Sequence, residues 1–359
     1  MNHLSDSKNV HTVSISHKAI IIIIFLIEVI SAQFFFSNRE DTITIVFGGD
    51  VMLSRKVGAE IKKMGVNYPF MSIRDIFLPA DLSVVNLESI VGTQTKFVDK
   101  EYVFQAEPSV LKGLKWAGID AVSLANNHSF DCFSAGVIEC ADSVWNSGII
   151  PLGIGKNSAE FFRPHSFWIQ GNWFVIMGLN DTKSGFWGDD KPGCAPTWTA
   201  RGESIAVDII STLAEIGAIV IVFEHWGWEY QQFPDERQLQ LGHKLIRAGA
   251  KVVVGSHPHR IQGVEFYKNG VIAYSLGNLI FDQKDSLGNI GAILELTFIG
   301  NRIYTISMLP VEMFSTFAQP KPANSDSMLE YFRNLSLPLN TDVYIEDGRF
   351  FFRPLEKQE

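Results

Sequence analysis

Short apolar strands alternate with amphipathic helices along most of this chain, and this alternation most constrains its fold. Runs rich in β-branched residues predict buried strands at residues 42–47, 81–85, 119–124, 173–179, 218–223 and 251–254. Helical spacing of apolar residues predicts helices that mostly end next to a glycine, at residues 108–117, 134–146, 203–216 and 235–248. An alternation of this kind predicts an α/β protein with its strands in a central sheet.

The region after residue 260 changes character, because strands follow one another there without helices between them. The predicted strands are residues 261–266, 271–274, 292–299 and 303–308. We therefore expect a mixed sheet, or a second sheet packed on the first. Periodicity is lost after Phe314, where several prolines occur. We expect one domain over residues 40–314 and a C-terminal tail over residues 315–359 that packs on the domain surface.

The composition fits a large globular domain and argues against nucleic-acid binding. The chain has 359 residues, of which 46% are hydrophobic and 19% charged, so a sizeable core is expected rather than disorder. The formal net charge of −9 lacks the basic excess of a general nucleic-acid binder. It does not exclude an anionic substrate, because bound divalent metals can reverse the local potential. The three cysteines are too few and odd in number for a disulfide framework, so we expect buried free thiols.

An apolar segment near the N-terminus has the character of an export signal. Residues 1–18 form a polar segment ending in Lys18, and residues 19–36 are largely apolar with one charge at Glu28. The uninterrupted run suits a signal peptide with Ala32 as a candidate cleavage residue, and the whole segment is marginally long enough for a membrane anchor. Either interpretation predicts a domain on the outer side of the cell membrane, anchored through one N-terminal segment or exported after signal cleavage.

Five predicted strands each lead directly into side chains that bind metals. In α/β sheets, ligands bind beyond the carboxyl ends of the strands, so these side chains are expected to meet. The five junctions are Gly49-Asp50, Asn86-Leu87-Glu88, Asn126-Asn127-His128, Glu224-His225-Trp226-Gly227 and Gly255-Ser256-His257-Pro258-His259. Any one of them has an ordinary structural explanation, such as a helix cap or a core histidine. Their recurrence at five strand ends predicts a metal site.

The ligand types at these junctions indicate the class of metal and of chemistry. Carboxylate, amide and imidazole ligands without thiolates suit Mn, Fe or Zn. A bridging carboxylate allows two divalent metal ions, which polarise a substrate oxygen and lower the pKa of a bound water. His128 could then protonate a leaving group. Asp131 either holds the His128 imidazole in its working tautomer or caps a helix.

At these residues the chain resembles a known protein family. The motifs that carry the resemblance are Gly49-Asp50-Val51-Met52-Leu53, Asn86-Leu87-Glu88, Ala125-Asn126-Asn127-His128, His225-Trp226-Gly227-Trp228-Glu229-Tyr230, His257-Pro258-His259 and Tyr274-Ser275-Leu276-Gly277-Asn278. Together, and in this order, they resemble the bacterial capsule synthesis protein CapA family, which is associated with poly-γ-glutamate synthesis and export. The resemblance runs from about residue 43 to residue 309. It implies a calcineurin-like metallophosphatase-type fold, a layered αββα sandwich, together with the N-terminal hydrophobic segment that many members carry.

The resemblance also implies a role for each metal-binding residue. Asp50, Glu88 and His259 match the ligands of the first metal, with Glu88 in the place of the bridging aspartate. Asn127, His225 and His257 match the ligands of the second metal, and His128 matches the acid beside it. Met52 stands where metallophosphatases carry a histidine ligand, so we expect the first metal to bind more weakly than the second. Both this change and the longer Glu88 side chain make ordinary phosphatase activity doubtful.

Other polar and aromatic residues near the junctions are candidates for substrate binding. Asn86 and Asn126, which belong to two of the five junctions, are candidates of this kind. Trp226 lines a substrate groove or belongs to the core. Arg260 either binds an anionic group of the substrate or forms a surface salt bridge. Asn278 either supports a metal ligand or is a turn residue.

Two classes of function remain open at this stage. The first is a metal-dependent hydrolase or transferase acting on an acidic polymer, or a metallophosphoesterase of another substrate. The second is a non-catalytic, membrane-anchored assembly factor of a polymer-export complex, with membrane synthase or export proteins as partners. The set of predicted ligands favours the catalytic function. Met52 and the family's association with a multi-protein process favour the non-catalytic assembly factor.

Overall fold

A computed structural model describes residues 42–185, 188–283, 286–313, 318–323 and 326–355. The hydrophobic segment predicted at residues 19–36 lies outside these ranges. Among the described residues, no helix is both long and apolar enough to cross a bilayer. The described ranges all fall in one compact unit, Ser37–Glu359.

Two β-sheets form the centre of the domain. The larger has ten strands in the order β19-β20-β17-β16-β1-β2-β5-β6, with β15 added beside β1 and β18 beside β17. Its strands are β1 (Thr42–Val51), β2 (Leu82–Leu87), β5 (Ala121–Ser123), β6 (Ile150–Leu152), β15 (Asn278–Ile280), β16 (Ile290–Ile299), β17 (Arg302–Glu312), β18 (Lys321–Pro322), β19 (Thr341–Glu346) and β20 (Arg349–Pro354). The predicted mixed sheet is confirmed, because β1, β2, β5 and β6 are parallel while β16 and β17 are antiparallel.

The second sheet has six strands in the order β13-β14-β12-β11-β9-β8. They are β8 (His165–Ile169), β9 (Asn172–Asn180), β11 (Ile219–His225), β12 (Ala250–Ser256), β13 (Val264–Tyr267) and β14 (Gly270–Ala273). Strands β9, β11, β12 and β14 run parallel to one another. Short strand pairs outside the two sheets join β3 (Ile90–Val91) to β4 (Gln105–Ala106) and β7 (Ile154–Gly155) to β10 (Gly193–Cys194).

The two sheets pack face to face through alternate apolar residues. In β1, Ile43, Ile45 and Phe47 point into the core between the sheets, and Val46 belongs to the core on the other face. Successive side chains of a strand point to opposite faces, so a strand buried on both sides is apolar throughout. Direct contact between the sheets is seen where Phe47 meets Phe223 of β11, with ring centroids 5.8 Å apart.

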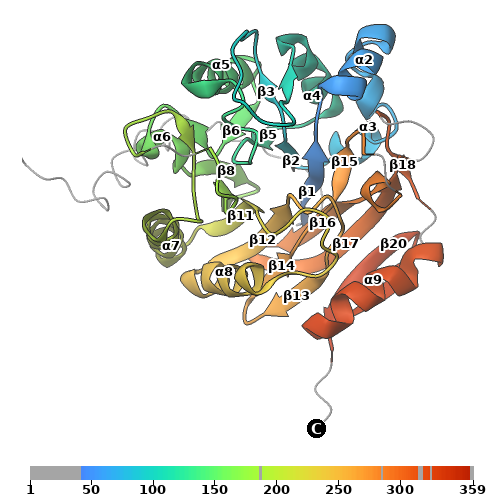
Figure 1. Cartoon of the computed structure of the whole chain (residues 1–359). Helices are drawn as coiled ribbons and strands as arrows, with labels where there is room; N and C mark the ends of the chain where they lie inside the picture. The colour runs from blue at the N-terminus through green and yellow to red at the C-terminus, as the bar shows by residue number, and fades with distance from the viewer. Residues whose placement is uncertain (1–41, 186–187, 284–285, 314–317, 324–325, 356–359) are drawn as a thin grey trace, which may run out of the picture. The chain divides into compact units, whose positions relative to one another are not determined.

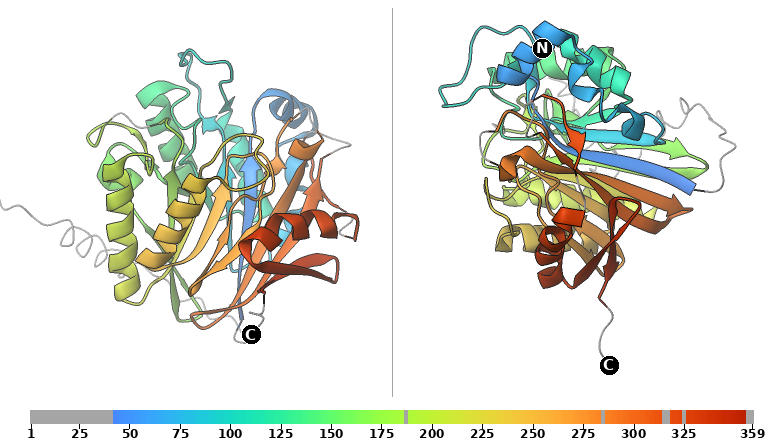
Figure 2. Two further views of the ribbon diagram at one scale, coloured as in Figure 1. Left: turned by 60° about the horizontal axis from the view of Figure 1, so that its bottom comes forward. Right: turned by 90° about the vertical axis from the view of Figure 1, so that its right-hand side faces the viewer.

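Helices cover the outer faces of both sheets. Helices α2 (Arg55–Met64), α3 (Arg74–Phe77), α4 (Leu111–Ala117) and α5 (Phe133–Asn146) pack on the larger sheet around one apolar core. Helices α7 (Ala200–Glu215) and α8 (Glu236–Ala248) pack on β11 and β12 of the smaller sheet, and α6 (Ser158–Phe161) packs on β7. The right-hand view of Figure 2 shows the blue and teal helices on one side of the stacked strands. The predicted αββα sandwich is therefore confirmed (Figure 1).

Two glycines allow backbone segments near the strand ends to approach one another closely. A Cβ at Gly49 would lie 1.9 Å from the Gly277 carbonyl oxygen, and one at Gly255 would lie 1.9 Å from that of Tyr274. Neither gap can hold a side chain, so both positions require glycine. The close approach at Gly49 lets the Asp50 amide donate to the Gly277 carbonyl at 3.0 Å. It thereby fixes Asp50 beside the loop that carries Asn278.

The C-terminal residues differ from the expected surface tail. After Phe314 the described chain forms α9 (Leu329–Ser336) and the hairpin β19–β20, which adds two strands to the larger sheet beside β17. Phe332, Val343 and Phe350 are buried in the core between the sheets. Residues 329–354 are therefore part of the domain, and the predicted boundary at residue 314 falls too early. Apolar burial, rather than surface contact, holds them in place.

We expect Phe350→Ala to lower the free energy of unfolding by about 3–5 kcal/mol, the usual cost of removing a buried aromatic ring. Phe350 is fully buried and stacks on Phe332, with ring centroids 4.2 Å apart. The measurement is chemical denaturation of a shortened chain that begins at Arg39. Leu355→Ala is the matched control, because Leu355 is 40% exposed, and it should change stability by less than about 0.5 kcal/mol. Equal effects of the two changes would contradict this packing.

Candidate metal centre

The five strand ends predicted to meet do lie together. Asp50 is the penultimate residue of β1, and Glu88 follows β2 directly in the larger sheet, whereas His225 is the last residue of β11 in the smaller sheet. One ligand atom from each of these three buried residues lies within 4.8 Å of the others. The remaining predicted ligands come from the segments after β5 and β12. Both sheets therefore contribute side chains to one centre.

Glu88 is the residue whose charge most needs a partner. Its side chain is fully buried, and within the described residues neither carboxylate oxygen accepts a hydrogen bond. Burial is the main reason that the pKa of Glu88 is raised well above its ordinary value. Leaving a buried carboxylate without hydrogen bonds costs several kcal/mol or drives its protonation. A bound cation would satisfy both oxygens, so this position fits a metal ligand.

His259 faces Glu88 and is held by residues on its other side. Its Nδ1 lies 2.8 Å from the Asn278 side-chain oxygen and 3.4 Å from a carboxylate oxygen of Asp50. Its Nε2 therefore points to Glu88, 3.8 Å from Oε1. Burial opposes charging of this imidazole, but the Glu88 and Asp50 carboxylates raise its pKa to about 9. In the absence of a cation, a charged His259 thus balances part of the negative charge.

His225 and His257 are neutral imidazoles next to this acidic pair. His225 Nε2 lies 3.0 Å from the Asn127 side-chain oxygen, and its Nδ1 lies 2.9 Å from the Ser256 hydroxyl. His257 Nδ1 has no hydrogen-bond partner among the described residues. Burial lowers the pKa of His257 to about 3 and that of His225 well below its ordinary value. Neutral imidazoles with a free lone pair are the form that binds a metal.

The backbone around the two histidines after β12 adopts a conformation that non-glycine residues rarely take. His257 has a φ of +100° and His259 a φ of +52°. Tyr230 also has a positive φ, +68°, and its amide donates to the Pro258 carbonyl at 2.7 Å. Such conformations cost about 1–3 kcal/mol each and concentrate at functional sites. The strain here aims both imidazoles at the centre.

Asn86 and Asn126 form a buried hydrogen-bonded pair beside Asp50. The Asn86 side-chain amide donates to Asp50 at 2.8 Å, and that of Asn126 donates to the Asn86 side-chain oxygen at 3.2 Å. The Asn126 oxygen in turn accepts from the His128 amide. Both asparagines are buried, at 0% and 1% exposure. Asn86 thus supports the candidate ligand Asp50, and Asn126 supports Asn86 and the backbone at His128. Direct contact of either asparagine with a substrate stays a prediction.

Asn278, Trp226 and Arg260 also have defined surroundings. Asn278 pairs with Asp50 in the β1–β15 register and supports His259, as one of its two interpretations predicted. Trp226 is fully buried, and its indole N–H donates to the Tyr274 carbonyl at 2.8 Å, so it belongs to the core and lines no groove. Arg260 is buried and donates to the His259 carbonyl, so it is not a surface residue.

Met52 does not offer its sulfur to the centre. The side chain is fully buried, and its sulfur accepts hydrogen bonds from the Ser54 amide at 3.2 Å and the Ser54 hydroxyl at 3.0 Å. A thioether is in any case a poor ligand for hard or borderline cations. The resemblance places a histidine ligand at position 52. In this chain the position is occupied by a methionine whose sulfur bonds to Ser54, the residue before α2.

His128 is held by contacts that set its tautomer. Its Nδ1 lies 2.7 Å from the Asp131 carboxylate, and its ring stacks on Phe104 with centroids 3.8 Å apart. The Nε2 atom faces the centre, 3.7 Å from Glu88. Burial lowers the pKa of His128 to about 4, although Asp131 acts in the opposite direction. The ring is therefore neutral at pH 7, with the Nδ1 proton directed to Asp131.

Asp131 acts as a partner of His128 and not as a helix cap. The N-cap of α5 is Cys132, and no side chain caps this helix. The Asp131 carboxylate also accepts from the Phe104 amide at 2.7 Å and pairs with Lys100. Lys100 additionally donates to the Asn127 carbonyl at 3.1 Å.

Several residues of the centre could not be identified from the sequence. Lys100 and Phe104 lie in an irregular segment before β4 and belong to no recognisable motif. Arg55 pairs with the buried Asp282 carboxylate, and its guanidinium lies 5.3 Å from the Phe104 ring centroid. Ser256, the partner of His225, belongs to the motif after β12, and its place directly before His257 is the only signal that could have identified it.

Comparison with known proteins identifies a family. Residues 44–283 match the model of the family described as "Bacterial capsule synthesis protein PGA_cap". The chain belongs to this family. The chain is similar to the PGA biosynthesis protein CapA of Bacillus subtilis, with 28% identity over 87% of this chain and 83% of that protein. The capsule biosynthesis protein CapA of Bacillus anthracis is 28% identical over 80% of this chain and 71% of its own length.

Among solved structures, a hypothetical protein from Thermus thermophilus aligns with 75% of this PGA_cap chain and 99% of its own. The TM-score is 0.46 and the sequence identity 16%.

We expect Glu88→Gln to abolish metal-dependent stabilisation without destabilising the metal-free protein. The neutral amide keeps the shape of the side chain but removes the buried charge that a cation would balance. The measurement is the thermal midpoint with chelator and with added Mn²⁺ or Zn²⁺. The parent should gain stability with metal, by an amount that grows with metal concentration.

Glu60→Gln is the matched control, because Glu60 lies on α2 with a side chain 40% exposed. It should respond to metal as the parent does. A Glu88→Gln protein that keeps the full metal response would show that Glu88 is no ligand.

Proposed function

We propose that this PGA_cap chain is a metal-dependent hydrolase or transferase that acts on an acidic polymer in capsule or poly-γ-glutamate synthesis and export. The observation that carries the proposal is the buried Glu88 carboxylate, which has no hydrogen-bond partner among the described residues and is surrounded by imidazoles. A buried charge of this kind is unfavourable unless a cation completes it. The names of the Bacillus relatives supply the polymer class.

Two divalent ions, Mn, Fe or Zn, are the proposed cofactors. Asn127, His225 and His257 would hold the tighter ion, and Asp50 and His259 would hold the weaker one, with Glu88 shared between them. Mixed oxygen and imidazole ligands fit these metals. When bound, such ions would polarise a substrate oxygen and make water a better nucleophile.

His128 is the proposed proton donor to the leaving group. Its Nε2 faces the centre, while its Nδ1 proton is directed to Asp131. In the free protein the ring is neutral, because burial lowers its pKa to about 4. An anionic group that enters beside it would favour the protonated form, since an opposite charge raises the pKa of an imidazole. Asp131 holds the ring in the orientation required for this transfer.

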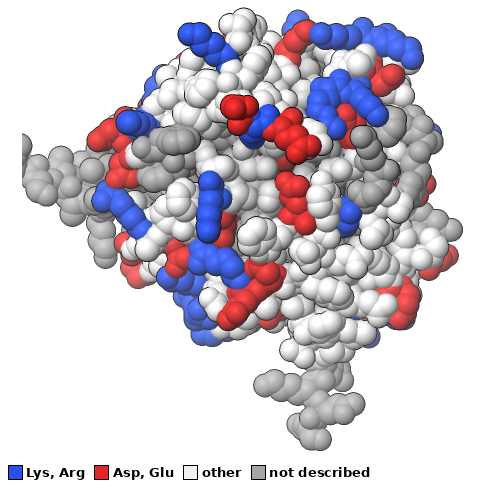
Figure 3. Space-filling view, in the orientation of Figure 1, with Lys and Arg blue, Asp and Glu red and all other residues white. Residues whose placement is uncertain are grey.

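Cationic side chains around the centre support an anionic substrate. Lys100 and Arg55 flank His128 and Phe104, and Arg260 lies 5.1 Å from the Tyr230 ring centroid. Acidic and basic side chains are interspersed on the face seen in Figure 3, and the described residues there form no basic stripe. This mixed distribution suits a local anion site rather than a long basic surface.

An assembly role without turnover is the second candidate, and Met52 is the observation that favours it. The sulfur of Met52 bonds to Ser54, so one ligand of the weaker ion is missing. A centre that holds only one metal ion would bind the polymer without catalysing its hydrolysis or transfer. In that case the partners would be membrane synthase or export proteins.

For either function, we propose that residues 19–36 place the domain on the outer side of the cell membrane. The segment then serves as a single anchor, or as a signal peptide cleaved after Ala32. A polymer that is exported must cross this boundary, which supports the location.

We expect His128→Ala to reduce turnover of poly-γ-glutamate by roughly 10²–10⁴-fold while metal content stays at the parental level. His128 lies 3.7 Å from Glu88 and is not among the proposed ligands. The measurements are polymer chain length by gel filtration and metal content by elemental analysis. His243→Ala is the control. His243 lies on α8 and pairs with Glu265 of β13, so this change should leave turnover and metal content unchanged.

If the parent binds metal but never shortens or transfers the polymer, the assembly role replaces the catalytic one.

We expect Met52→His to raise metal content toward two ions and to increase phosphoesterase activity on a small aryl phosphate. An imidazole at this position adds the ligand that the weaker ion lacks. Titration calorimetry compares parent and variant. Met52→Leu is the control, because it fills the same buried volume without offering a ligand. If the histidine and leucine variants bind equal amounts of metal, residue 52 does not contact the weaker ion.

A further inference from the structure

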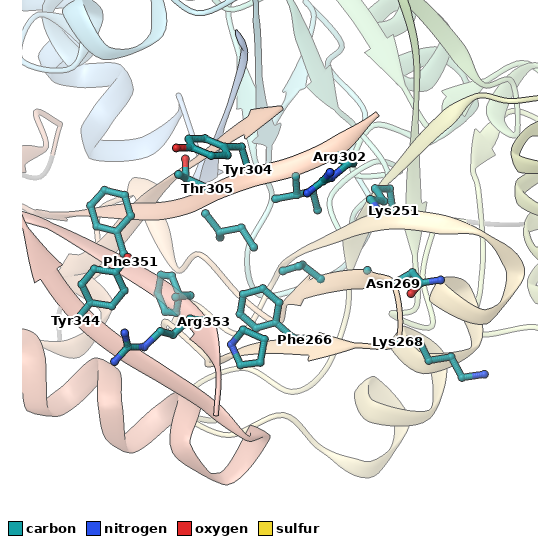
Figure 4. A pocket seen from close by; sticks show the side chains of 16 residues that line it. Lys251, Phe266, Lys268, Asn269, Arg302, Tyr304, Thr305, Tyr344, Phe351 and Arg353 are labelled. Carbon is teal, nitrogen blue, oxygen red and sulfur yellow. The ribbon is translucent and has the colours of Figure 1, made fainter. Parts of the chain in front are cut away.

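A basic pocket opens at the end of the sandwich opposite the metal centre. It lies where β12 and β14 begin, whereas the proposed ligands follow the carboxyl end of β12. The volume is about 470 Å³. Figure 4 shows it between the strand that carries Arg302 and Tyr304 and the turn that carries Lys268 and Asn269. One wall therefore comes from each sheet, and the pocket is the open mouth between them.

The charge of the pocket is of one sign. Lys251, Lys268, Arg302 and Arg353 contribute to its lining, and none of the sixteen described residues that line it is acidic. Arg353 pairs with Asp342, whereas Lys251, Lys268 and Arg302 form no ion pair within the described residues. The whole chain carries a net charge of −9, so this is a local departure from its overall character. Three uncompensated cations around one hollow favour an anionic ligand.

Apolar and aromatic side chains surround these cations. Phe266, Tyr344 and Phe351 line the pocket, and Tyr304 on its wall is 67% exposed. Ile299, three residues before Arg302, is 43% exposed, and Leu355, just after β20, is 40% exposed. Exposed tyrosine and aliphatic groups beside lysine and arginine are typical of surfaces that lie against a membrane interface. A purely anionic polymer would not require the aliphatic rim.

The chain enters the domain from the proposed membrane segment at this same end. Thr42, the first residue of β1, pairs with Ile299, and Ile299 pairs with Arg302 across the next turn. Arg302 is thus two strand spacings, about 10 Å, from the start of β1. Only five residues, 37–41, separate the hydrophobic run from Thr42, and they span at most about 20 Å. An anchored chain must hold this end of the domain near the lipid headgroups.

We propose that this end of the domain docks onto an anionic phospholipid bilayer, with the pocket receiving a phosphate-bearing headgroup. Lys251, Lys268 and Arg302 attract the phosphate, and Tyr304, Ile299 and Leu355 contact the interface. The inference rests on the proposed membrane anchor in residues 19–36. Because the metal centre lies at the other end of the strands, docking directs it away from the bilayer toward polymer in solution.

The test is hydrogen exchange of residues 299–304 in the full chain, reconstituted in nanodiscs of phosphatidylcholine alone or mixed with phosphatidylglycerol. We expect slower exchange in the mixed discs. The double change Lys268→Gln and Arg302→Gln should weaken docking by about 30-fold, since each basic residue near an anionic surface contributes about a factor of five. The protection should then be lost. Both side chains are exposed, so the fold should survive, which the thermal midpoint checks.

The matched control is Lys62→Gln with Lys63→Gln on α2, whose side chains are 69% and 70% exposed. It removes the same charge at the metal-centre end and should keep the protection. Equal exchange in both lipids, or equal loss in the control, overturns the docking. Protection by soluble poly-γ-glutamate in neutral discs overturns it in favour of a polymer site. A full chain that fails to enter either disc refutes the anchor, which is a separate and recognisable failure.

Discussion

The negative charge of Glu88, buried between two sheets, is the constraint on which the centre of this domain depends. Asp50 lies beside it, and within the described residues neither oxygen of Glu88 receives a hydrogen bond. The surrounding imidazoles respond to this charge in different ways. The carboxylates keep His259 charged, whereas burial keeps His225 and His257 neutral. A cation would let all three rings act as ligands, so the electrostatics of the centre and its proposed chemistry have one origin.

Much of the fold could be predicted because its strands are buried on both faces. Continuous apolar runs such as Ile219–Phe223 mark such strands wherever they fall in the chain. The C-terminal hairpin could not be predicted, because prolines and charged residues around its two short strands interrupt the apolar pattern. A signal is nevertheless present, since Asp347-Gly348 is a favoured hairpin turn, and both residues have a positive φ.

The clustering of the candidate ligands could be predicted because strand ends meet at one edge of a sheet. The roles of the neighbouring residues could not, because they depend on contacts between segments far apart in the sequence. Asn86 and Trp226 lie at the same kind of strand end as the candidate ligands, yet Asn86 supports Asp50 and Trp226 fills the core. Lys100 reaches His128 from an irregular segment, for which no periodicity exists. Only tertiary structure separates these cases.

The position of β1 has a consequence for how the chain acquires its shape. This first strand is central in the larger sheet, and one of its neighbours, β16, comes from the far end of the chain, with Thr42 opposite Ile299. Synthesis delivers the N-terminal half first, so β1 must wait with an open edge until most of the protein has been made. A chain that threads through a membrane pore in the same order would stay extended during passage. Folding would then begin only on the far side, once β16 had arrived.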